Sequence, residues 1–434
     1  MRAGREGVSA VTSTRYSFYN DLFLRSVGSL NTTNLENMLG MFATMGGGLL
    51  SSIEPLDTHK VKDMSWAFRG THISSTPVTD TTNVENISYA FYDTRINDFS
   101  FVDMSNVKSA ICTFASTPIT NAPDIDISNV ERLDNLFSSC VYLTSVPNYN
   151  LSNAKSIAGM FMNCTRLTAV PEFNLYDIEN MDSIFASCSA LSALPNLDTS
   201  KVKSMNGFVS NCPNISSIPN YDTSNVSGLQ GAFFNCKNLT YIPSLNTSAV
   251  TDLNNNFYNC SKLSTIPLLD THNVSSLRNT FSGCSSLLTI PQLDLCNVED
   301  MTKTFCYCRS LTSLPTLNTS AVKTMDSAFY LSKLHDFPQM DTRNVSSMRM
   351  TFGYCGTISS TLPLYDTNNI VHIESAFYGC ARVQSGALAL YEQMTAQAVP
   401  PLYHSATFRD CGHSTYQGYL ELQQIPSSWG GLGT

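Results

Sequence analysis

The sequence predicts an α/β solenoid, a stack of short coils that each contain one parallel strand and one short helix. Three features predict this fold: an Asp or Asn, a proline and a cysteine each recur at a shared interval. The interval is 24 residues through the middle of the chain and 23 to 26 residues elsewhere. A fixed period of this length is typical of solenoids, in which each repeat buries its apolar residues against its neighbours.

The Asp or Asn column marks fifteen units, and the proline and cysteine columns stay in step with it at ten positions each. The Asp or Asn that opens each unit falls at Asn31, Asp57, Asp80, Asp103, Asp126, Asn150, Asn174, Asp198, Asp222, Asn246, Asp270, Asp294, Asn318, Asp341 and Asp366. The prolines are Pro147, Pro171, Pro195, Pro219, Pro243, Pro267, Pro291, Pro315, Pro338 and Pro363. The cysteines are Cys140, Cys164, Cys188, Cys212, Cys236, Cys260, Cys284, Cys308, Cys355 and Cys380.

One repeat, read from Asp222, indicates how each coil is built. Apolar side chains three, four and three residues apart predict a short helix, and the Thr-Ser-Asn before them offers N-cap oxygens. These side chains are Val226, Leu229, Phe233 and Cys236. The next segment, "KNLTYIPSL", predicts a strand with Leu239 and Ile242 inward. This strand ends at Pro243, because proline cannot donate to a sheet ladder.

The repeat divides the chain into three predicted parts. Residues 1–30 lack the repeat and form an N-terminal cap or attachment segment, residues 31–380 form the solenoid, and residues 381–434 form a C-terminal cap. Within the last part, "SGALALYEQMTAQAV" predicts a longer helix that Pro400 and Pro401 stop. "SATFRDC" predicts a last half-repeat, followed by a capping tail.

Composition excludes several classes of function. Charged residues are 14% of the chain, against roughly 25% in a typical globular protein. Because Lys and Arg form no dense run, we expect no nucleic-acid partner. No run of 18 apolar residues occurs, so we expect no membrane insertion. The first thirty residues lack the pattern of a secretory leader, and the last twelve lack a hydrophobic tail.

The repeat text "IPxLDTSNVxxMxxxFxxCxxL" resembles the short leucine-rich repeat of the BspA-like group. That group occurs in bacterial surface proteins, mycoplasma lipoproteins and phage tail proteins. The resemblance covers roughly residues 31–380, and it implies a leucine-rich-repeat solenoid with a role in adhesion or recognition. The segment from Leu388 onward also resembles the ending of such proteins from gut bacteria and their phages.

The cysteine column has three interpretations. The favoured one is a buried small residue behind the Phe, as free cysteines usually are. A disulfide such as Cys296–Cys306 is the second interpretation. A metal site that includes Cys308 is the third, although it lacks a fourth ligand and CxxC spacing. Thr117 and Ser332 occupy the same column without a thiol, which favours the first interpretation.

The Asp or Asn column has two interpretations, a turn former or a calcium ladder. A turn needs only the acceptor oxygen that Asn retains, whereas a cation site needs the charge that Asn lacks. We therefore predict turns, with His59 and His272 as exposed variants of the residue two places later. The chain contains no P-loop, dinucleotide fingerprint, nucleophile elbow or paired-histidine motif. We expect no enzymatic activity, no cofactor and no metal.

Positions that vary between repeats indicate where a ligand would be recognised. The residue after each proline and the residue two before it vary, on the strand side where solenoids usually bind partners. The candidate recognition residues are Tyr241, Ser244, Asn148, Glu172, Asn196, Asn220, Gln292 and Gln339. Because this face is small and polar with few aromatic side chains, a solvated spacer is the alternative interpretation.

The leading functional hypothesis is a non-enzymatic phage virion protein, in the tail or an appendage, that contributes to host-surface recognition. Its expected partners are a host surface protein or glycan and other virion proteins, and a homo-oligomer is also open. Its expected location is the virion, an extracellular particle. The alternatives are an adhesin on the bacterial cell surface and a purely structural decoration or collar protein of a virion.

Overall fold

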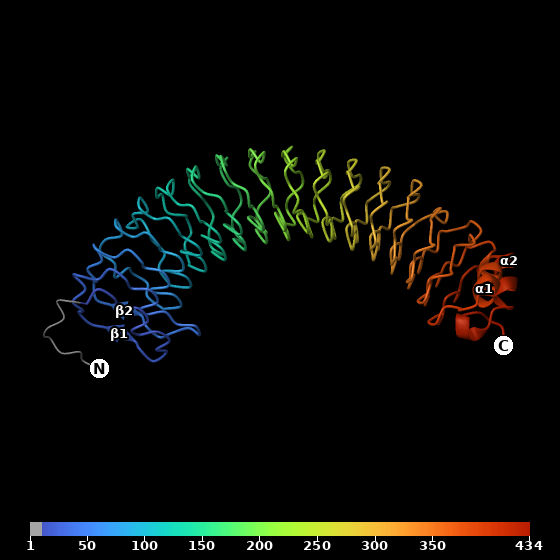
Figure 1. Cartoon of the computed structure of the whole chain (residues 1–434), viewed down its shortest axis with the longest axis horizontal. Helices are drawn as coiled ribbons and strands as arrows, with labels where there is room; N and C mark the ends of the chain where they lie inside the picture. The colour runs from blue at the N-terminus through green and yellow to red at the C-terminus, as the bar shows by residue number, and fades with distance from the viewer. Residues whose placement is uncertain (1–10) are drawn as a thin grey trace. The chain divides into compact units, whose positions relative to one another are not determined.

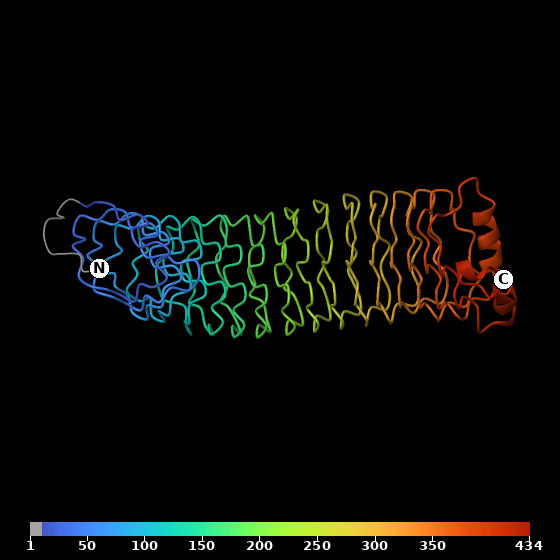
Figure 2. The same cartoon turned by 90° about the horizontal axis from the view of Figure 1, so that it is seen from below.

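The computed structural model describes residues 11–434 and divides the chain into two compact units. We call Met1–Ser204 the first unit and Met205–Thr434 the second unit. The boundary between the units lies inside the predicted solenoid. Because each coil of a solenoid contacts only the coils beside it, few contacts join distant coils of the chain. Within each unit consecutive coils lie side by side, as Figure 1 and the turned view in Figure 2 show.

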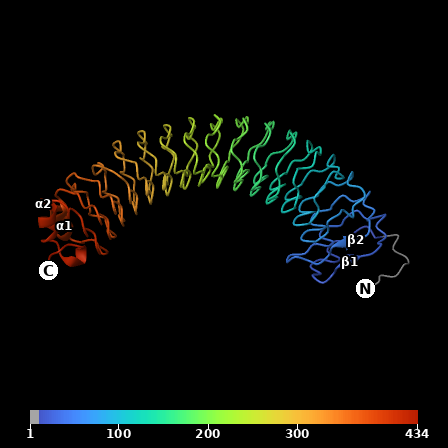
Figure 3. The same ribbon diagram turned by 180° about the vertical axis from the view of Figure 1, so that it is seen from behind.

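Regular secondary structure occurs only at the two ends of the described residues. The elements are the strands β1 (Ser26–Val27) and β2 (Ser52–Ile53), the helices α1 (Ala387–Thr395) and α2 (Tyr416–Leu422), and the 3-10 helix η1 (Ser427–Trp429). β1 and β2 pair in parallel in the first unit, and both helices belong to the second unit (Figure 3). α1 confirms the helix predicted after Cys380.

Isolated parallel bridges connect the coils of each unit. We number positions from the Asp or Asn that opens a repeat, which is position 0, and the bridges lie at position 6. In the first unit they link Ser13, Asn37, Asp63, Asn86, Ser109, Arg132, Ser156, Asn180 and Ser204 in turn. In the second unit they link Gly228, Asp252, Ser276, Asp300, Thr324, Ser347, His372 and Tyr403. Each unit is therefore a stack of coils, as the repeat predicts.

The helix predicted in every coil is wrong. Among the described residues, helices occur only after residue 386. Positions 7 to 14 form a run of tight turns instead. In the coil that Asp222 opens, the amides of Gly231, Phe233 and Asn235 donate to carbonyls of the next coil at 3.0, 3.1 and 2.6 Å. The amides between them donate three residues back, whereas an α-helix bonds four residues back.

Left-handed residues at positions 9 and 13 explain why these turns replace a helix. Gly231 and Asn235 both have φ of 60°, and Asn255 and Asn259 of the next coil have φ of 57° and 58°. Glycine and asparagine tolerate this conformation best, and it interrupts a right-handed helix. A helix and this turn run give apolar residues the same spacing, so the spacing alone cannot distinguish them.

The strand predicted before each proline is also wrong for the coil that carried the prediction. Residues 237–245 of the second unit hold no strand. The amide of Thr240 donates to the carbonyl of Ser216 at 3.2 Å, and Pro243 has no N–H to extend this pairing. Leu239 and Ile242 nevertheless point inward, since both are fully buried.

The Asp or Asn at position 0 forms a turn, as predicted. A carboxylate oxygen of Asp126 accepts the Ser128 amide at 2.9 Å, and the amide oxygen of Asn246 accepts the Ser248 amide at 3.0 Å. Both residue types make the same bond, which explains why they interchange along the column. Hydrogen bonds from the side chain and the backbone of Ser128 lower the pKa of Asp126.

The threonine and asparagine of the DTSNV text join a coil to its two neighbours. The Thr81 hydroxyl accepts the amide N–H of Asp103 at 2.7 Å and donates to its carbonyl at 3.1 Å. The Asn83 side-chain amide donates to the carbonyl of His59 in the preceding coil at 2.7 Å. These side chains satisfy backbone groups that regular secondary structure would otherwise satisfy. The DTSNV residues are therefore repeated because they hold neighbouring coils together.

Phenylalanine rings at position 11 stack along the core of each unit. In the first unit, neighbouring ring centroids are 5.3 to 6.4 Å apart. In the second unit, they are 5.3 to 5.9 Å apart. Stacked rings contribute beyond the apolar area that they bury, so this column is the main apolar contact between coils.

The cysteines at position 14 are buried behind these rings, which confirms the favoured interpretation. All fourteen cysteines are free, and only Cys296 is half-exposed. The Cys260 thiol donates to the Phe233 carbonyl of the preceding coil at 3.1 Å, and burial raises the pKa of this thiol well above its ordinary value. The Cys296–Cys306 disulfide is wrong, because both thiols are free.

The stack begins before residue 31, the predicted start of the solenoid. The Phe18 ring stacks on the Phe42 ring with centroids 5.3 Å apart. Tyr16 and Asn20 have φ of 56° and 57°, as expected of positions 9 and 13 in a coil. This coil lacks the cysteine and the DTSNV text, so the sequence pattern does not reveal it. Residues 1–10 of the predicted cap lie outside the described residues.

The last coil of the second unit forms at the predicted half-repeat. The Phe408 ring stacks on the Phe377 ring with centroids 5.7 Å apart, and Cys411 is buried. Trp429 of η1 then covers this end, with its ring centroid 4.0 Å from that of His404 and 6.5 Å from that of Phe408. The apolar core of this unit therefore ends beneath a tryptophan.

Candidate binding surfaces

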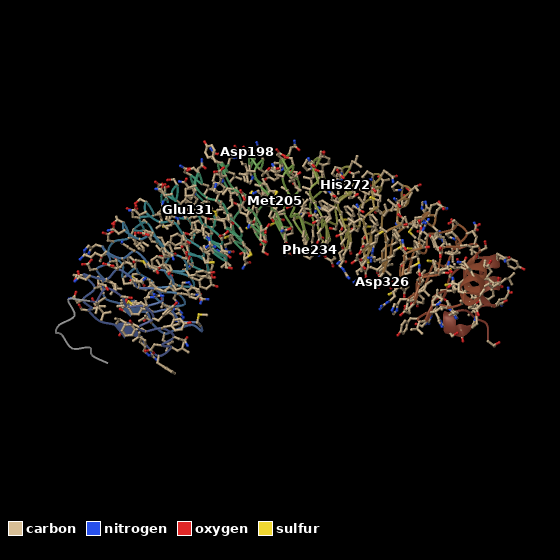
Figure 4. All side chains as sticks on the ribbon, viewed as in Figure 1. Glu131, Asp198, Met205, Phe234, His272 and Asp326 are labelled. Atoms are coloured by element: carbon tan, nitrogen blue, oxygen red, sulfur yellow. The ribbon has the colours of Figure 1, made fainter. Side chains whose placement is uncertain are left out.

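Each coil presents surfaces that we define by position. The Asx edge comprises positions 0 to 2, the turn edge comprises positions 8 to 13, and the proline flank runs from two residues before the proline to one residue after it. In the second unit, Figure 4 shows His272 on the Asx edge and Phe234 and Asp326 on the opposite, turn edge.

All eight predicted recognition residues lie on the proline flank and are exposed. Two shallow hollows border this flank, and the hollow of the first unit extends onto the Asx edge. The hollow of the first unit, about 300 Å³, is lined by Asn148, Tyr149, Asn150, Glu172, Asn174 and Tyr176. The hollow of the second unit, about 190 Å³, is lined by residues 312–316 and 336–339. Tyr241, Ser244, Asn196, Asn220 and Gln292 line neither hollow.

The hollows therefore bring Asn148 and Glu172 together and include Gln339. Each hollow has one carboxylate, Glu172 or Asp336, among amides and hydroxyls. The Tyr149 hydroxyl donates to the Pro123 carbonyl at 2.6 Å, and burial raises its pKa far above the ordinary value. Such a lining can hold a polar group by hydrogen bonds, but it offers no pair of carboxyls for acid–base chemistry.

Two further features of the described chain bear on function. Across residues 11–434, no cluster of three or more His, Cys, Asp or Glu side chains is placed to hold a metal ion. Over the same residues, no helix has the length and apolar character needed to cross a membrane.

The turn edge of the first unit carries an aromatic cluster around one arginine. The Arg69 guanidinium lies 4.5 Å from the Trp66 ring centroid and 5.0 Å from the Tyr92 ring centroid. The Trp66 and Tyr89 ring centroids are 4.9 Å apart. A hydrogen bond with Cys112, together with burial, raises the pKa of Tyr89 to about 12. The cluster thus presents one cation among uncharged rings.

The turn edge of the second unit carries a row of four tyrosines from four consecutive coils. They are Tyr307, Tyr330, Tyr354 and Tyr378. Their ring centroids are 5.5, 5.7 and 4.8 Å apart in that order, and each ring meets the next edge to face. Tyr307 and Tyr354 are 41% and 43% exposed. We call these four residues the tyrosine row.

An arginine lies at each end of the tyrosine row. The Arg309 guanidinium is 5.7 Å from the Tyr307 ring centroid, and the Arg409 guanidinium is 5.6 Å from the Tyr378 ring centroid. Cations over ring faces are attracted by the ring quadrupole. The guanidinium groups therefore stay beside the rings, where their remaining N–H donors can meet a ligand.

Charged side chains at position 8 lie beside the tyrosine row. The Arg349 Nε is 3.7 Å from an Asp326 carboxylate oxygen and 3.9 Å from a Glu374 carboxylate oxygen. These three residues come from three consecutive coils, so they form an ion-pair group along the turn edge. The edge thus combines flat apolar rings with donors and acceptors, which suits binding rather than catalysis.

Sequence reasoning missed the turn edge because it placed these residues on a helix. The usable signal was a pair of Gly, Asn or Ser residues four apart in most repeats, such as Gly207 with Asn211 and Gly231 with Asn235. Glycine and asparagine favour a left-handed backbone, and the pair marks positions 9 and 13 of the coil. In the coils of the tyrosine row, Tyr307 and Tyr354 themselves occupy position 13, with φ of 59°.

The chain is similar to solved structures of leucine-rich repeat proteins from bacteria. A leucine-rich repeat protein from Eubacterium ventriosum is 16% identical, with 84% of this chain and 83% of that chain covered and a TM-score of 0.43. A leucine-rich repeat protein from Bacteroides ovatus is 18% identical, with coverage of 86% and 81% and a TM-score of 0.37. A leucine-rich cell surface protein from Faecalibacterium prausnitzii is 16% identical, with coverage of 71% and 85% and a TM-score of 0.34.

Comparison of sequences places the chain in a family. No curated protein matches it. A family of repeat-bearing sequences matches four overlapping or adjoining segments, residues 6–99, 102–217, 192–289 and 275–391. These segments cover most of the chain, including the coils of both units. The chain therefore belongs to the family described as "Mycoplasma protein of unknown function, DUF285".

Proposed function

We propose that this chain is a non-enzymatic binding protein that recognises a protein or glycan on a host surface through its turn edge. The observation that carries the proposal is the gathering of Trp, Tyr and Arg on the turn edge of the first unit and of Tyr and Arg on the turn edge of the second. These are the residue types that dominate binding hot spots, because they bury large area and donate hydrogen bonds at small entropic cost.

The composition of the other surfaces supports the same assignment. The Asx edge uses its polar atoms for turns and links between coils, as Asp126 and Thr81 do. The proline flank is small and polar apart from a few side chains such as Tyr241 and Leu268, which are 59% and 66% exposed. The aromatic side chains of the turn edge are packed in clusters, which reduces the entropy lost when a ligand fixes them.

We further propose a phage virion, in its tail or an appendage, as the setting of this binding protein. This setting comes from the resemblance of the repeat to those of phage tail proteins. An adhesin on the bacterial cell surface and a structural collar or decoration protein are the alternatives. A mass-spectrometric inventory of purified phage particles and of bacterial envelopes separates them, since only a virion component copurifies with particles. Absence from particles would overturn the virion setting.

Removal of exposed tyrosines tests the recognition role. The variant Tyr307→Ala with Tyr354→Ala removes two rings of the tyrosine row. The matched control Tyr176→Ala with Tyr241→Ala removes two exposed rings outside the turn edge, Tyr176 on the Asx edge and Tyr241 on the proline flank. Fluorescently labelled full-length chains are titrated onto a panel of bacterial strains, with and without protease treatment of the cells. Protease-resistant binding indicates a glycan partner, and protease-sensitive binding indicates a protein partner.

The turn-edge variant is expected to bind at least about tenfold more weakly, the equivalent of one hot-spot residue. The control is expected to bind like the wild type. Loss of binding in the control alone would move recognition to the Asx edge or the proline flank. No binding by the wild-type chain, or equal binding by all three chains, would overturn recognition through the turn edge.

A further inference from the structure

The first unit carries an exposed ladder of alternating charge at position 5. The acidic residues are Glu36, Glu85, Glu131 and Glu179. The basic residues, one coil further on in each case, are Lys62, Lys108, Lys155 and Lys203. All eight side chains are exposed, and the backbone of each residue bonds to that of the next at 2.8 to 3.2 Å. We call this set the charge ladder; Figure 4 labels one member, Glu131.

Stacking of coils does not require these charges. Position 5 of the second unit holds Ser227, Thr251 and Ser275 in three successive coils, and those coils stack on the same phenylalanine column. Serine or threonine at position 5 would also keep neighbouring coils free of contacts between like charges. In the second unit the charged residues at position 5 are Glu299 and Lys323, which pair with each other at 2.7 Å. The run of eight alternating charges in the first unit therefore points to a further role.

Ion pairs within the chain leave most of the charge ladder unused. The Lys203 Nζ is 2.8 Å from a Glu179 carboxylate oxygen, and Lys155 pairs with Asp177 at 2.9 Å. Over residues 11–434, the other five members, Glu36, Lys62, Glu85, Lys108 and Glu131, form no ion pair within 4.0 Å. Five charges of alternating sign are therefore available to a partner.

We infer that the charge ladder is a self-complementary surface on which a second copy of this chain docks with its ladder running in the opposite direction. A two-fold axis between Lys108 and Glu131 pairs the first member with the eighth, the second with the seventh, and so on. Glu36 then faces Lys203, Lys62 faces Glu179, Glu85 faces Lys155, and Lys108 faces Glu131. Every pair is opposite in charge, as an isologous interface requires.

The neighbouring position 3 fits the same pairing. Its charged members in these eight coils are Lys60, Asp177 and Lys201, and the others are asparagines. Under the same two-fold axis Lys60 faces Asp177, which is again a pair of opposite charges. Lys201 faces Asn34, which carries no charge. The complementarity therefore extends over two columns without a like-charge contact.

The pattern favours the unshifted antiparallel pairing. A shift by one coil would put Glu36 opposite Glu179, so every pair would carry like charges, and a shift by two coils would leave two members of each ladder without a partner. Ladders running in the same direction face each residue with its own copy, and shifting one of them by a coil to avoid this gives no closed two-fold pairing. At about 4.8 Å per coil the ladder spans roughly 34 Å, which is long enough for an interface of ordinary size.

The test compares the full-length chain with three variants by light scattering and sedimentation. The positive variant is Glu36→Lys, Glu85→Lys, Glu131→Lys and Glu179→Lys. The negative variant is Lys62→Glu, Lys108→Glu, Lys155→Glu and Lys203→Glu. The neutral variant replaces all eight residues with Ser, which occupies this position in three coils of the second unit, at Ser227, Ser275 and Ser346. Circular dichroism checks that each variant is folded.

The wild type is expected to be a dimer at about 0.02 M salt and to dissociate at least about tenfold more readily at about 0.5 M salt, where the charges are screened. The positive, negative and neutral variants are expected to be monomers alone, and the positive and negative variants are expected to form a dimer when mixed. A monomeric wild type at low salt, or a neutral variant that dimerises like the wild type, would overturn the inference. If a like-charged variant does not fold, the neutral variant carries the test.

Discussion

The two units stack the same coil but differ at the positions that the coil leaves free. Position 5 alternates in charge through eight coils of the first unit, whereas in the second unit it is charged in two of the seven coils that open with an Asp or Asn, at Glu299 and Lys323. The turn edge holds Trp66 and Arg69 around one cluster in the first unit and the tyrosine row in the second unit. These differences concern exposed or half-exposed side chains.

Other features are the same in both units. Asx oxygens accept an amide two residues on, at Asp126 in the first unit and Asn246 in the second. The phenylalanine stack and the left-handed pair at positions 9 and 13 also recur in both. The comparison teaches that backbone and core contacts define the coil, which leaves the surface positions free to serve different partners in each unit.

Substitutions in the phenylalanine stack are expected to cause the largest loss of stability in both units. Phe68 in the first unit and Phe281 in the second are both fully buried between two stacked neighbours. We expect Phe68→Ala and Phe281→Ala each to lower the free energy of unfolding by about 3–5 kcal/mol, because each leaves a large cavity. Urea unfolding followed by circular dichroism measures the change.

Leucine at the same two positions is the control, since it retains most of the apolar volume and is expected to cost much less than alanine. Similar losses in both units would support one shared framework. A loss below about 1 kcal/mol in either unit would show that the stack is not the main contact between coils there.

Much of this framework was predictable from the sequence. The period of the repeat identifies Phe233, Cys236, Leu239 and Ile242 as core, and all four are buried. The exchange of Asp for Asn at position 0 indicates a turn, which the Asp126 contact confirms. These features depend on residue chemistry that a column of repeats displays directly.

The path of the backbone between these residues was not predictable from apolar spacing. Positions 7 to 14 place apolar residues three, four and three apart in a turn run as in a helix, and tertiary hydrogen bonds between coils decide between the two. The same error hid the turn edge, because a helix was predicted over these positions in each coil. Only the left-handed residues, Gly231 and Asn235 among them, carried the distinction.

Substitutions at position 14 are expected to change the free energy of unfolding by an intermediate amount in both units. In early coils of the first unit a threonine occupies it, and the Thr94 hydroxyl donates to the Phe91 carbonyl at 3.0 Å. In later coils the Cys260 thiol donates to the Phe233 carbonyl. Both residues are small donors that fill the same space. We expect Thr94→Cys and Cys260→Thr to cost less than about 1 kcal/mol each.

Alanine at these positions removes both the donor and the volume. We expect Thr94→Ala and Cys260→Ala to cost about 1–2 kcal/mol each, measured by the same urea titration. If Cys260→Thr destabilises as much as Cys260→Ala, the two sets of coils do not share one pocket at position 14.

The smallest expected effect on stability comes from the Asp residues at position 0, and it is seen as a dependence of stability on pH. Hydrogen bonds from Ser128 lower the pKa of Asp126 in the first unit, and those from His272 lower the pKa of Asp270 in the second. A lowered carboxyl pKa means that folding favours the charged form. These bonds therefore stabilise the fold above the ordinary carboxyl pKa, about 4, and the stabilisation is lost as the pH falls through the folded pKa.

A variant with Asn at six position-0 residues tests this difference between charge and geometry. The substituted residues are Asp57, Asp80, Asp126, Asp198, Asp270 and Asp341, whose pKa values are all lowered. Near neutral pH the variant should melt within a few degrees of the wild type, because Asn keeps the acceptor oxygen that Asn246 already uses. As the pH falls below about 4, the wild type should lose more thermal stability than the variant. If both chains lose the same thermal stability in acid, the turns are stabilised by the acceptor oxygen alone, and the carboxylate charge does not contribute to the stability of either unit.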